Sequence, residues 1–268
     1  MGADIHEAAR GFSRVSDAYV LGRPTYPREA VAVLARELRL GPGRLVVDLA
    51  AGTGKLTALL VGTGAEVVAV EPLAEMRAAL ELALPEVRAL DGTAERMPLA
   101  AESVDAVTVG QAFHWFRGEE ALPEIHRVLR PGGGLGLVWN FRDESVGWLR
   151  RLTEILEPLR GNAPRYRSGN WQTAFAETRL FGPLRHEEFS FVQRLEPDAV
   201  VARVDSVSFV ASLPPAEREA VLAEVRDLLA RDPDTRGRAE LELPHRTDVF
   251  WCERLGRGEA SRPAAGRP

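Results

Sequence analysis

Two glycines follow a short apolar segment at residues 45–49, and this arrangement can bind a ligand through the backbone. The segment carries Asp48 near its end, and Gly52 and Gly54 lie in the turn before a helical stretch that starts at about Lys55. Glycines at this position let a ligand approach the backbone N–H groups at the N-terminus of the helix. We therefore expect this turn to bind a cofactor.

Three classes of ligand use turns of this kind, and the sequence distinguishes between them. A phosphate-binding loop requires glycine at position 49 and serine or threonine at position 56, where this chain has Leu49 and Leu56. A dinucleotide loop requires a third glycine at position 57, which is Thr57. An S-adenosylmethionine loop follows an acidic residue at the end of its strand, as this turn follows Asp48. The sequence therefore excludes a phosphate-binding loop, argues against a dinucleotide loop and agrees with an S-adenosylmethionine loop.

A second acidic residue, Glu71, follows the next apolar segment and lies 17 residues after Gly54. A carboxylate at the end of this strand can accept hydrogen bonds from both ribose hydroxyls of an adenosyl group, and its charge repels a 2′-phosphate. NAD and S-adenosylmethionine both contain such a ribose. Glu71 therefore supports an adenosyl ligand without deciding between these two.

Apolar segments that alternate with amphipathic ones must position these side chains. Continuous β-branched runs predict buried strands, and leucines at helical spacing predict the helices between them. This alternation predicts a parallel sheet with helices on both faces. The glycine-rich segment 130–134 is expected to end a helix, and Pro244 is expected to place the last strand at an edge or to mark a bulge. The predicted strands are 45–49, 67–70, 87–90, 104–109, 135–139, 188–192 and 241–252.

The composition restricts the function classes further. The 268 residues contain 34 basic and 39 acidic side chains, a formal net charge of −5, and the charges are interleaved, which argues against a nucleic-acid partner. The single cysteine, Cys252, excludes disulfide scaffolds and thiolate zinc sites, and we expect no metal. No apolar run approaches the roughly 18 residues of a membrane span, and the N-terminus has no export signal, so we expect a cytoplasmic protein without a membrane partner.

Five segments between residues 48 and 134 form a set. They are Asp48–Gly54 (DLAAGTG), Val70–Pro72 (VEP), Asp91–Leu99 (DGTAERMPL), and Gln111–Phe116 (QAFHWF) together with Leu129–Gly134 (LRPGGG). As a set they resemble class I S-adenosylmethionine-dependent methyltransferases of the small-molecule group. The resemblance implies S-adenosyl-L-methionine as cofactor. It also implies an α/β, Rossmann-like, doubly wound and mostly parallel seven-stranded sheet, with an N-terminal helical cap and a C-terminal antiparallel strand pair.

The resemblance assigns a role to each matched residue. It places the methionine part of the cofactor on the first turn, the ribose on Glu71 and the adenine beside the next two loops. The cofactor-binding residues that it implies are Asp48, Ala50, Gly52, Gly54, Glu71, Pro72, Met76, Thr93, Ala94, Glu95 and Gln111. Two of them depart from the family. Ala50 replaces the first glycine of the loop, and Thr93 replaces an aspartate that would bond to the adenine amine.

The implied reaction is an in-line displacement in which an acceptor atom attacks the methyl carbon of a sulfonium. A hydroxyl acceptor needs a general base, for which His114 is the best candidate, although a packing role for His114 stays open. A carboxylate acceptor is already ionised and needs a cation instead, such as Arg23 or Arg142. The residues expected near the acceptor are Tyr19, Arg23, Tyr26, Trp115, Trp139 and Arg142. Tyr19 and the segment Arg23–Pro27 (RPTYP) are also similar to the lead-in of trans-aconitate methyltransferases.

We expect methyl transfer to oxygen, either hydroxyl or carboxylate, of a small organic acceptor. Enzymes that methylate amines of bases or of glutamine carry an Asn/Asp-Pro-Pro-aromatic turn after the fourth strand, and this chain has Gln111–His114 there. Two other hypotheses stay open: an NAD-dependent oxidoreductase, and a non-catalytic relative that binds the cofactor as a partner subunit. The sequence makes no prediction of oligomeric state.

The chain divides into four parts. Residues 1–40 form an N-terminal cap or lead-in, residues 41–142 the S-adenosylmethionine-binding core, and residues 143–255 a C-terminal part of the same domain that shapes the acceptor pocket. Residues 256–268 are rich in glycine, proline, alanine and arginine, a composition typical of a disordered tail.

Overall fold

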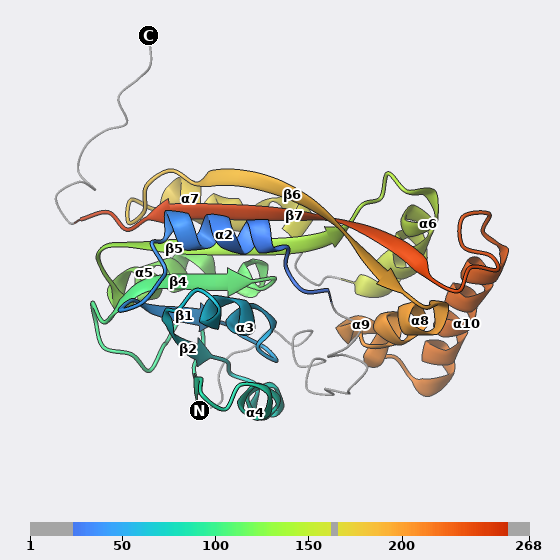
Figure 1. Ribbon diagram of the computed structural model, residues 1–268, viewed down its shortest axis with the longest axis horizontal. Helices are drawn as coiled ribbons and strands as arrows, with labels where there is room; N and C mark the ends of the chain where they lie inside the picture. Colours follow the sequence, from blue (N-terminus) through green and yellow to red (C-terminus); the bar gives the residue numbers. More distant parts are fainter. Residues whose placement is uncertain (1–23, 162–165, 257–268) are drawn as a thin grey trace, which may run out of the picture.

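Seven strands form one sheet within residues 24–161 and 166–256, the part of the chain that the computed structural model describes. The order is β3-β2-β1-β4-β5-β7-β6, with β7 antiparallel to both of its neighbours and the other pairs parallel (Figure 1). The strands are β1 Leu45–Leu49, β2 Glu66–Val70, β3 Arg88–Leu90, β4 Val104–Gly110, β5 Leu129–Arg142, β6 Arg185–Leu195 and β7 Leu241–Glu253. The Rossmann-like, mostly parallel sheet with an antiparallel C-terminal pair is confirmed.

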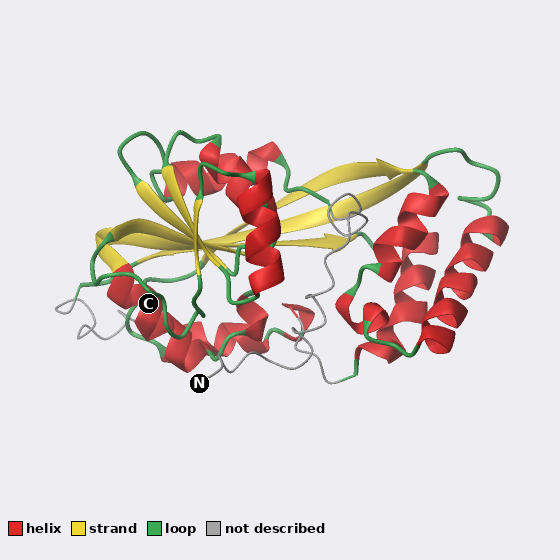
Figure 2. Ribbon diagram, turned by 90° about the horizontal axis from the view of Figure 1, so that it is seen from below, coloured by secondary structure: helices red, strands yellow, loops and turns green. Residues whose placement is uncertain are grey.

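Helices cover both faces of the sheet, as Figure 2 shows. Alternate residues of β1 point to opposite faces, so that Val46 packs with α2 and α3 while Val47 packs in the core that includes α5. The central strands are buried on both sides because their side chains are almost all apolar. The helices are α2 Arg28–Glu37, α3 Lys55–Val61, α4 Ala74–Ala83, α5 Gly118–Val128, α6 Gly147–Leu156, α7 Thr173–Glu177, α8 Pro197–Asp205, α9 Ser208–Ala211 and α10 Pro215–Arg231.

Helices α6, α8, α9 and α10 form a helical lobe at the far end of the long β6–β7 pair (Figures 1 and 2). Their apolar sides share a core of their own, which includes Leu149, Leu152 and Val225, and β7 adds Leu241 and Leu243 to it. The lobe is thus joined to the sheet through the two strands that extend beyond the parallel part. No helix in the described ranges has the length and apolar character of a membrane span.

Two segments lie differently from the sequence expectation. Strand β5 already begins at Leu129, so the glycine-rich segment 130–134 belongs to the strand and joins β4 through a register shift. Strand β7 lies between β5 and β6, so it is not an edge strand. Pro244 is tolerated because the β5–β7 pairing ends opposite His245, and the next residue after β5, Asp143, donates its N–H to Pro244 O at 2.9 Å, a contact that needs no N–H from the proline.

Candidate functional site

A cavity of about 700 Å³ lies at the carboxyl ends of β1, β2, β4 and β5 and extends to the helical lobe. This end of a doubly wound sheet is where such folds bind ligands. The predicted site residues that line it are Tyr26, Asp48, Ala50, Gly52, Glu71, Pro72, Met76, Thr93, Ala94, Glu95, Gln111, His114, Trp115, Trp139 and Arg142. Tyr19 and Arg23 lie outside the described residues, as does the predicted tail after Gly256.

The turn between β1 and α3 has a backbone that favours glycine. Ala50, Gly52 and Gly54 have φ values of 56°, 57° and 85°, all in the left-handed region. Gly54 does not line the cavity; a Cβ there would lie 3.0 Å from side-chain atoms of Leu80 and of Leu84. Gly54 therefore allows α4 to pack against the turn, whereas Ala50 and Gly52 form the cavity wall.

Asp48 is a buried carboxylate at the end of β1. Its side chain is 1% exposed, and Oδ2 accepts a 2.6 Å hydrogen bond from Thr57 Oγ1. Within the described part of the chain, Oδ1 is buried and accepts no hydrogen bond. Burial raises the pKa of Asp48 to about 7, and the charge of Glu71 adds to this effect. A donor with positive charge in the cavity would satisfy Oδ1 and stabilise the ionised form.

Glu71 joins the end of β2 to the glycine turn. Its Oε2 accepts a hydrogen bond from Gly52 N at 2.9 Å, and its Oε1 accepts one from Leu73 N at 2.9 Å. Burial raises the pKa of Glu71, while these two backbone hydrogen bonds oppose the rise. Each oxygen has a second lone pair, so the fixed carboxylate can accept two further bonds from a diol.

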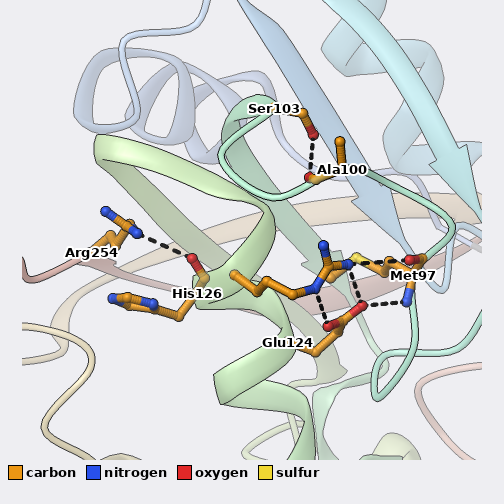
Figure 3. Close-up of polar contacts among 7 residues, drawn as sticks. Met97, Ala100, Ser103, Glu124, His126 and Arg254 are labelled. Atoms are coloured by element: carbon orange, nitrogen blue, oxygen red, sulfur yellow. Dashed lines mark hydrogen bonds and ion pairs between the residues drawn. The ribbon is translucent and has the colours of Figure 1, made fainter.

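The loop after β3 is anchored by α5, as Figure 3 shows. Glu124 accepts a 2.7 Å hydrogen bond from Met97 N, and Arg127 pairs with Glu124 at 2.6 Å and donates to Met97 O at 3.3 Å. Nearer the cavity, Glu95 Oε1 accepts from Arg117 N at 3.1 Å. These contacts hold the cavity wall formed by Thr93, Ala94 and Glu95.

His114 belongs to a 3₁₀ turn, Phe113–Trp115, after β4. Its Nδ1 lies 3.2 Å from Trp139 Nε1, which can only donate, so Nδ1 is the acceptor and the proton of the neutral ring is on Nε2. Burial and, to a smaller extent, the charge of Arg160 lower the pKa of His114 to about 4. The ring is therefore neutral at pH 7, with Nε2–H as its donor.

The strand ends around His114 are tightly constrained. Gln111 has a φ of 60°, and its Nε2 donates to Asn140 O at 2.9 Å, which joins the end of β4 to β5. A Cβ on Gly110 would lie 2.6 Å from the hydroxyl of Tyr26. Trp139 stacks on Tyr166 with ring centroids 4.6 Å apart. Gly110 and Tyr166 were not singled out from the sequence, because the segments that contact them are remote in the chain.

The part of the cavity toward the helical lobe is rich in arginine. Among the described lining residues are Arg142, Arg160, Arg167 and Arg203. Arg160 Nε lies 3.4 Å from Glu157 Oε2, and Arg167 Nη1 lies 2.6 Å from Glu144 Oε2. Only Arg142 was singled out from the sequence, since nothing in the local pattern separates the other three from surface arginines. The remaining lining residues here are Phe141, Thr153, Leu156, Val207 and Phe209.

Comparisons with known proteins show that this chain is similar to methyltransferases. A family model described as a methyltransferase domain matches residues 47–137. An uncharacterised methyltransferase of Mycobacterium tuberculosis is 42% identical over 88% of this chain and 92% of its own length. An uncharacterised methyltransferase-like protein of Schizosaccharomyces pombe is 36% identical over 88% of this chain and 92% of its own. A solved structure from Anaeromyxobacter dehalogenans, named as a type II methyltransferase, superposes with a TM-score of 0.63 at 23% identity and covers 87% of this chain and 97% of its own.

Proposed function

This chain belongs to the S-adenosylmethionine-dependent methyltransferases, and from this premise we propose that it methylates a carboxylate oxygen of a small organic acid. Family membership replaces the oxidoreductase hypothesis. The acceptor class is our inference, and the arginines that line the lobe side of the cavity carry it. The described residues that line this side include four arginines and two glutamates, Glu144 and Glu157.

The residues at the sheet end of the cavity fit S-adenosylmethionine. The buried Oδ1 of Asp48, with no acceptor bond from the described residues, suits the ammonium of the methionine part. The carboxylate of Glu71 suits the ribose diol, since backbone N–H groups already hold both of its oxygens in place. Met76 and Ala94 offer apolar surface for the adenine. When bound there, the cofactor supplies a methyl group on a positively charged sulfur.

The chemistry of the lobe side favours an acceptor that is ionised before it binds. A carboxylate has already lost its proton, so the protein has to align it and exclude water. Arginines bind carboxylates through paired N–H donors, and the neutral His114 offers one more donor at Nε2. The aromatic residues Trp139 and Tyr166 form a rigid wall beside it.

A hydroxyl acceptor is less compatible with this geometry. It would need a base to take its proton, and the lone pair on His114 Nδ1 already accepts from Trp139. The pKa of about 4 also makes this ring a weak base at neutral pH. We therefore propose that His114 binds the acceptor and does not act as a general base.

Incubation with methyl-labelled S-adenosylmethionine and fractionated cell extract tests this proposal. Methyl esters of carboxylic acids release volatile methanol in mild alkali, whereas methyl ethers and N- or C-methyl groups do not. We expect alkali-labile label in a small molecule, together with S-adenosylhomocysteine. Label that survives alkali would overturn the carboxylate assignment and leave the methyltransferase activity in place.

A further inference from the structure

Three apolar side chains of the helical lobe form part of the cavity wall. Leu156 lies at the end of α6, Val207 lies between α8 and α9, and Phe209 belongs to α9. Helix α9 lies on the side of the lobe that is nearer to the parallel strands (Figure 1). We call these three residues the lobe patch.

The lobe patch is only partly covered by the protein itself. Val207 and Phe209 pack against the core of the lobe but are only partly buried, whereas Leu149 and Val225 of that core are fully buried. Leu213 is also partly buried against this core, but it is not part of the cavity wall. The lobe therefore presents apolar surface to the cavity, and a ligand that covers this surface gains free energy from its burial.

Local contacts hold the lobe patch in place. The carbonyl oxygen of Val207 accepts hydrogen bonds from the N–H groups of Val210 and Ala211 at 2.9 and 2.8 Å, which fixes the start of α9. The ring of Phe209 lies under the guanidinium of Arg160, with 5.0 Å between Cζ and the ring centroid. Because Arg160 belongs to the 3₁₀ turn that follows α6, this cation–π contact joins α9 to the end of α6. The patch is thus a fixed surface of the cavity.

The sheet contributes aromatic surface to the same cavity. Trp139 and Phe141 of β5 both stack on Tyr166, with ring centroids 4.6 and 5.9 Å apart, and all three residues line the cavity. Aromatic faces bind hydrocarbon groups mainly through the burial of apolar area. Apolar surface is therefore available to a ligand both from the strand ends and from the lobe.

We propose, on the premise of the function above, that the acceptor is an amphipathic acid. Its hydrocarbon chain or ring binds the lobe patch, and its carboxylate receives the methyl group. A short acid would leave the patch in water, whereas each CH₂ group that the patch covers increases the affinity about fourfold. Val207 and Phe209 are then specificity-determining residues of the acceptor site.

Calorimetry on protein saturated with S-adenosylhomocysteine tests this inference. Butyrate is compared with octanoate and with 4-phenylbutyrate, which keep the carboxylate and add a chain or a ring. The wild type should bind at least one of the larger acids about 10-fold or more tightly than butyrate. 1-Butanol and 1-octanol are titrated as well, because they report on the patch without a carboxylate.

Three substitutions distinguish the lobe patch from apolar binding elsewhere. Phe209→Ala should reduce the preference for the larger ligands at least about threefold, because it removes apolar surface from the cavity wall. Val207→Thr, which keeps the shape of the side chain but adds a hydroxyl, should reduce it in the same direction. Leu213→Ala truncates a side chain on the same core outside the cavity wall, and it should keep the preference within about twofold. Thermal denaturation with S-adenosylhomocysteine shows that each variant is folded.

The outcomes separate this inference from the proposed function. If the wild type binds the small and the large ligands equally, or binds none of them, the inference is wrong. An undiminished preference in folded Phe209→Ala and Val207→Thr proteins would also overturn it. Methyl transfer is scored separately with labelled cofactor. A preference for 1-octanol over 1-butanol without any methyl ester would refute the proposed function alone. Esters formed from butyrate and from the larger acids with equal kcat/KM would refute the inference alone.

Discussion

At the scale of single residues, the site depends on two carboxylates that the fold removes from water. Asp48 is 1% and Glu71 4% exposed, and burial is the main cause that raises the pKa of each. Their surroundings differ, because backbone N–H groups hold both oxygens of Glu71 while one oxygen of Asp48 accepts no bond within the described chain. The buried charge of Asp48 therefore lowers the free energy of unfolding of the cofactor-free protein, and a bound ligand that donates to Oδ1 would offset this loss.

Asp48→Asn should therefore stabilise the cofactor-free protein at pH 8 by at least about 1 kcal/mol. The folded-state pKa of about 7 lies above the usual value of 3.8, so ionisation of Asp48 costs stability increasingly as the pH rises between these values. Chemical denaturation should show a large gain at pH 8 and little at pH 4, with cofactor binding weakened about 10-fold or more. A variant less stable than the wild type at pH 8 would contradict this account.

Glu71→Gln should weaken binding of S-adenosylhomocysteine by about 10-fold or more, since the ribose hydroxyls lose a charged acceptor. Glu75→Gln, an exposed glutamate of the neighbouring helix α4, is the matched control and should leave the affinity unchanged. Calorimetry at 25 °C measures both. Equal affinities for the two variants would remove Glu71 from the ribose site.

The pH dependence of turnover tests the role of His114. With saturating cofactor and a carboxylate acceptor, the turnover number should be constant from pH 6 to 8, because a ring with a pKa of about 4 stays neutral there and no base is needed. His114→Phe should raise KM for the acceptor and keep the flat profile. A rise with a midpoint near 6.5 that disappears in His114→Phe would instead establish His114 as the base.

At the scale of elements, the turn between β1 and α3 is shaped by backbone conformation. Gly52 and Gly54 adopt left-handed conformations at no steric cost, whereas Ala50 adopts one with a side chain. The neighbouring Ala51 has an ordinary φ. This departure from the family glycine therefore appears in the structure as local strain at the cavity wall.

Ala50→Gly is expected to raise the free energy of unfolding by about 1 kcal/mol, because glycine relieves the left-handed strain. Ala51→Gly, one residue further on, should lower it instead, since glycine there only increases the entropy of the unfolded chain. Urea denaturation of the two variants provides the comparison. A loss of stability in both would show that Ala50 is not strained.

At the scale of the whole molecule, two cores support two halves of one cavity. The sheet and its helices hold the predicted cofactor residues, and the helical lobe, with its own core, holds Thr153 and Arg203. The acceptor must therefore lie between parts that are joined mainly by β6 and β7. We propose that the lobe, within residues 143–255, sets acceptor specificity.

Leu152→Ala, in the lobe core, should cost about 2–5 kcal/mol of local stability and raise KM for the acceptor, while S-adenosylhomocysteine affinity stays within about twofold. Leu80→Ala removes a side chain that packs on Gly54 and should weaken cofactor binding instead. Calorimetry with the cofactor product and steady-state kinetics distinguish the two effects. Parallel losses of cofactor affinity in both variants would show that the lobe is not independent.

The sequence by itself determined the parallel sheet and which predicted residues line the sheet end of the cavity. Strand, glycine turn and helix are contiguous in the chain, and parallel strands bring Asp48 and Glu71 to one edge, so local spacing carries this information. Only the tertiary structure decided the arrangement of the lobe end, where we propose that the acceptor binds. The hydrogen bond between His114 and Trp139, and the placement of Arg203 beside His245, join segments 25 and 42 residues apart. The first contact depends on how the turn after β4 folds onto β5, and the second on how α8 packs against the β6–β7 pair. No local pattern of side chains encodes either.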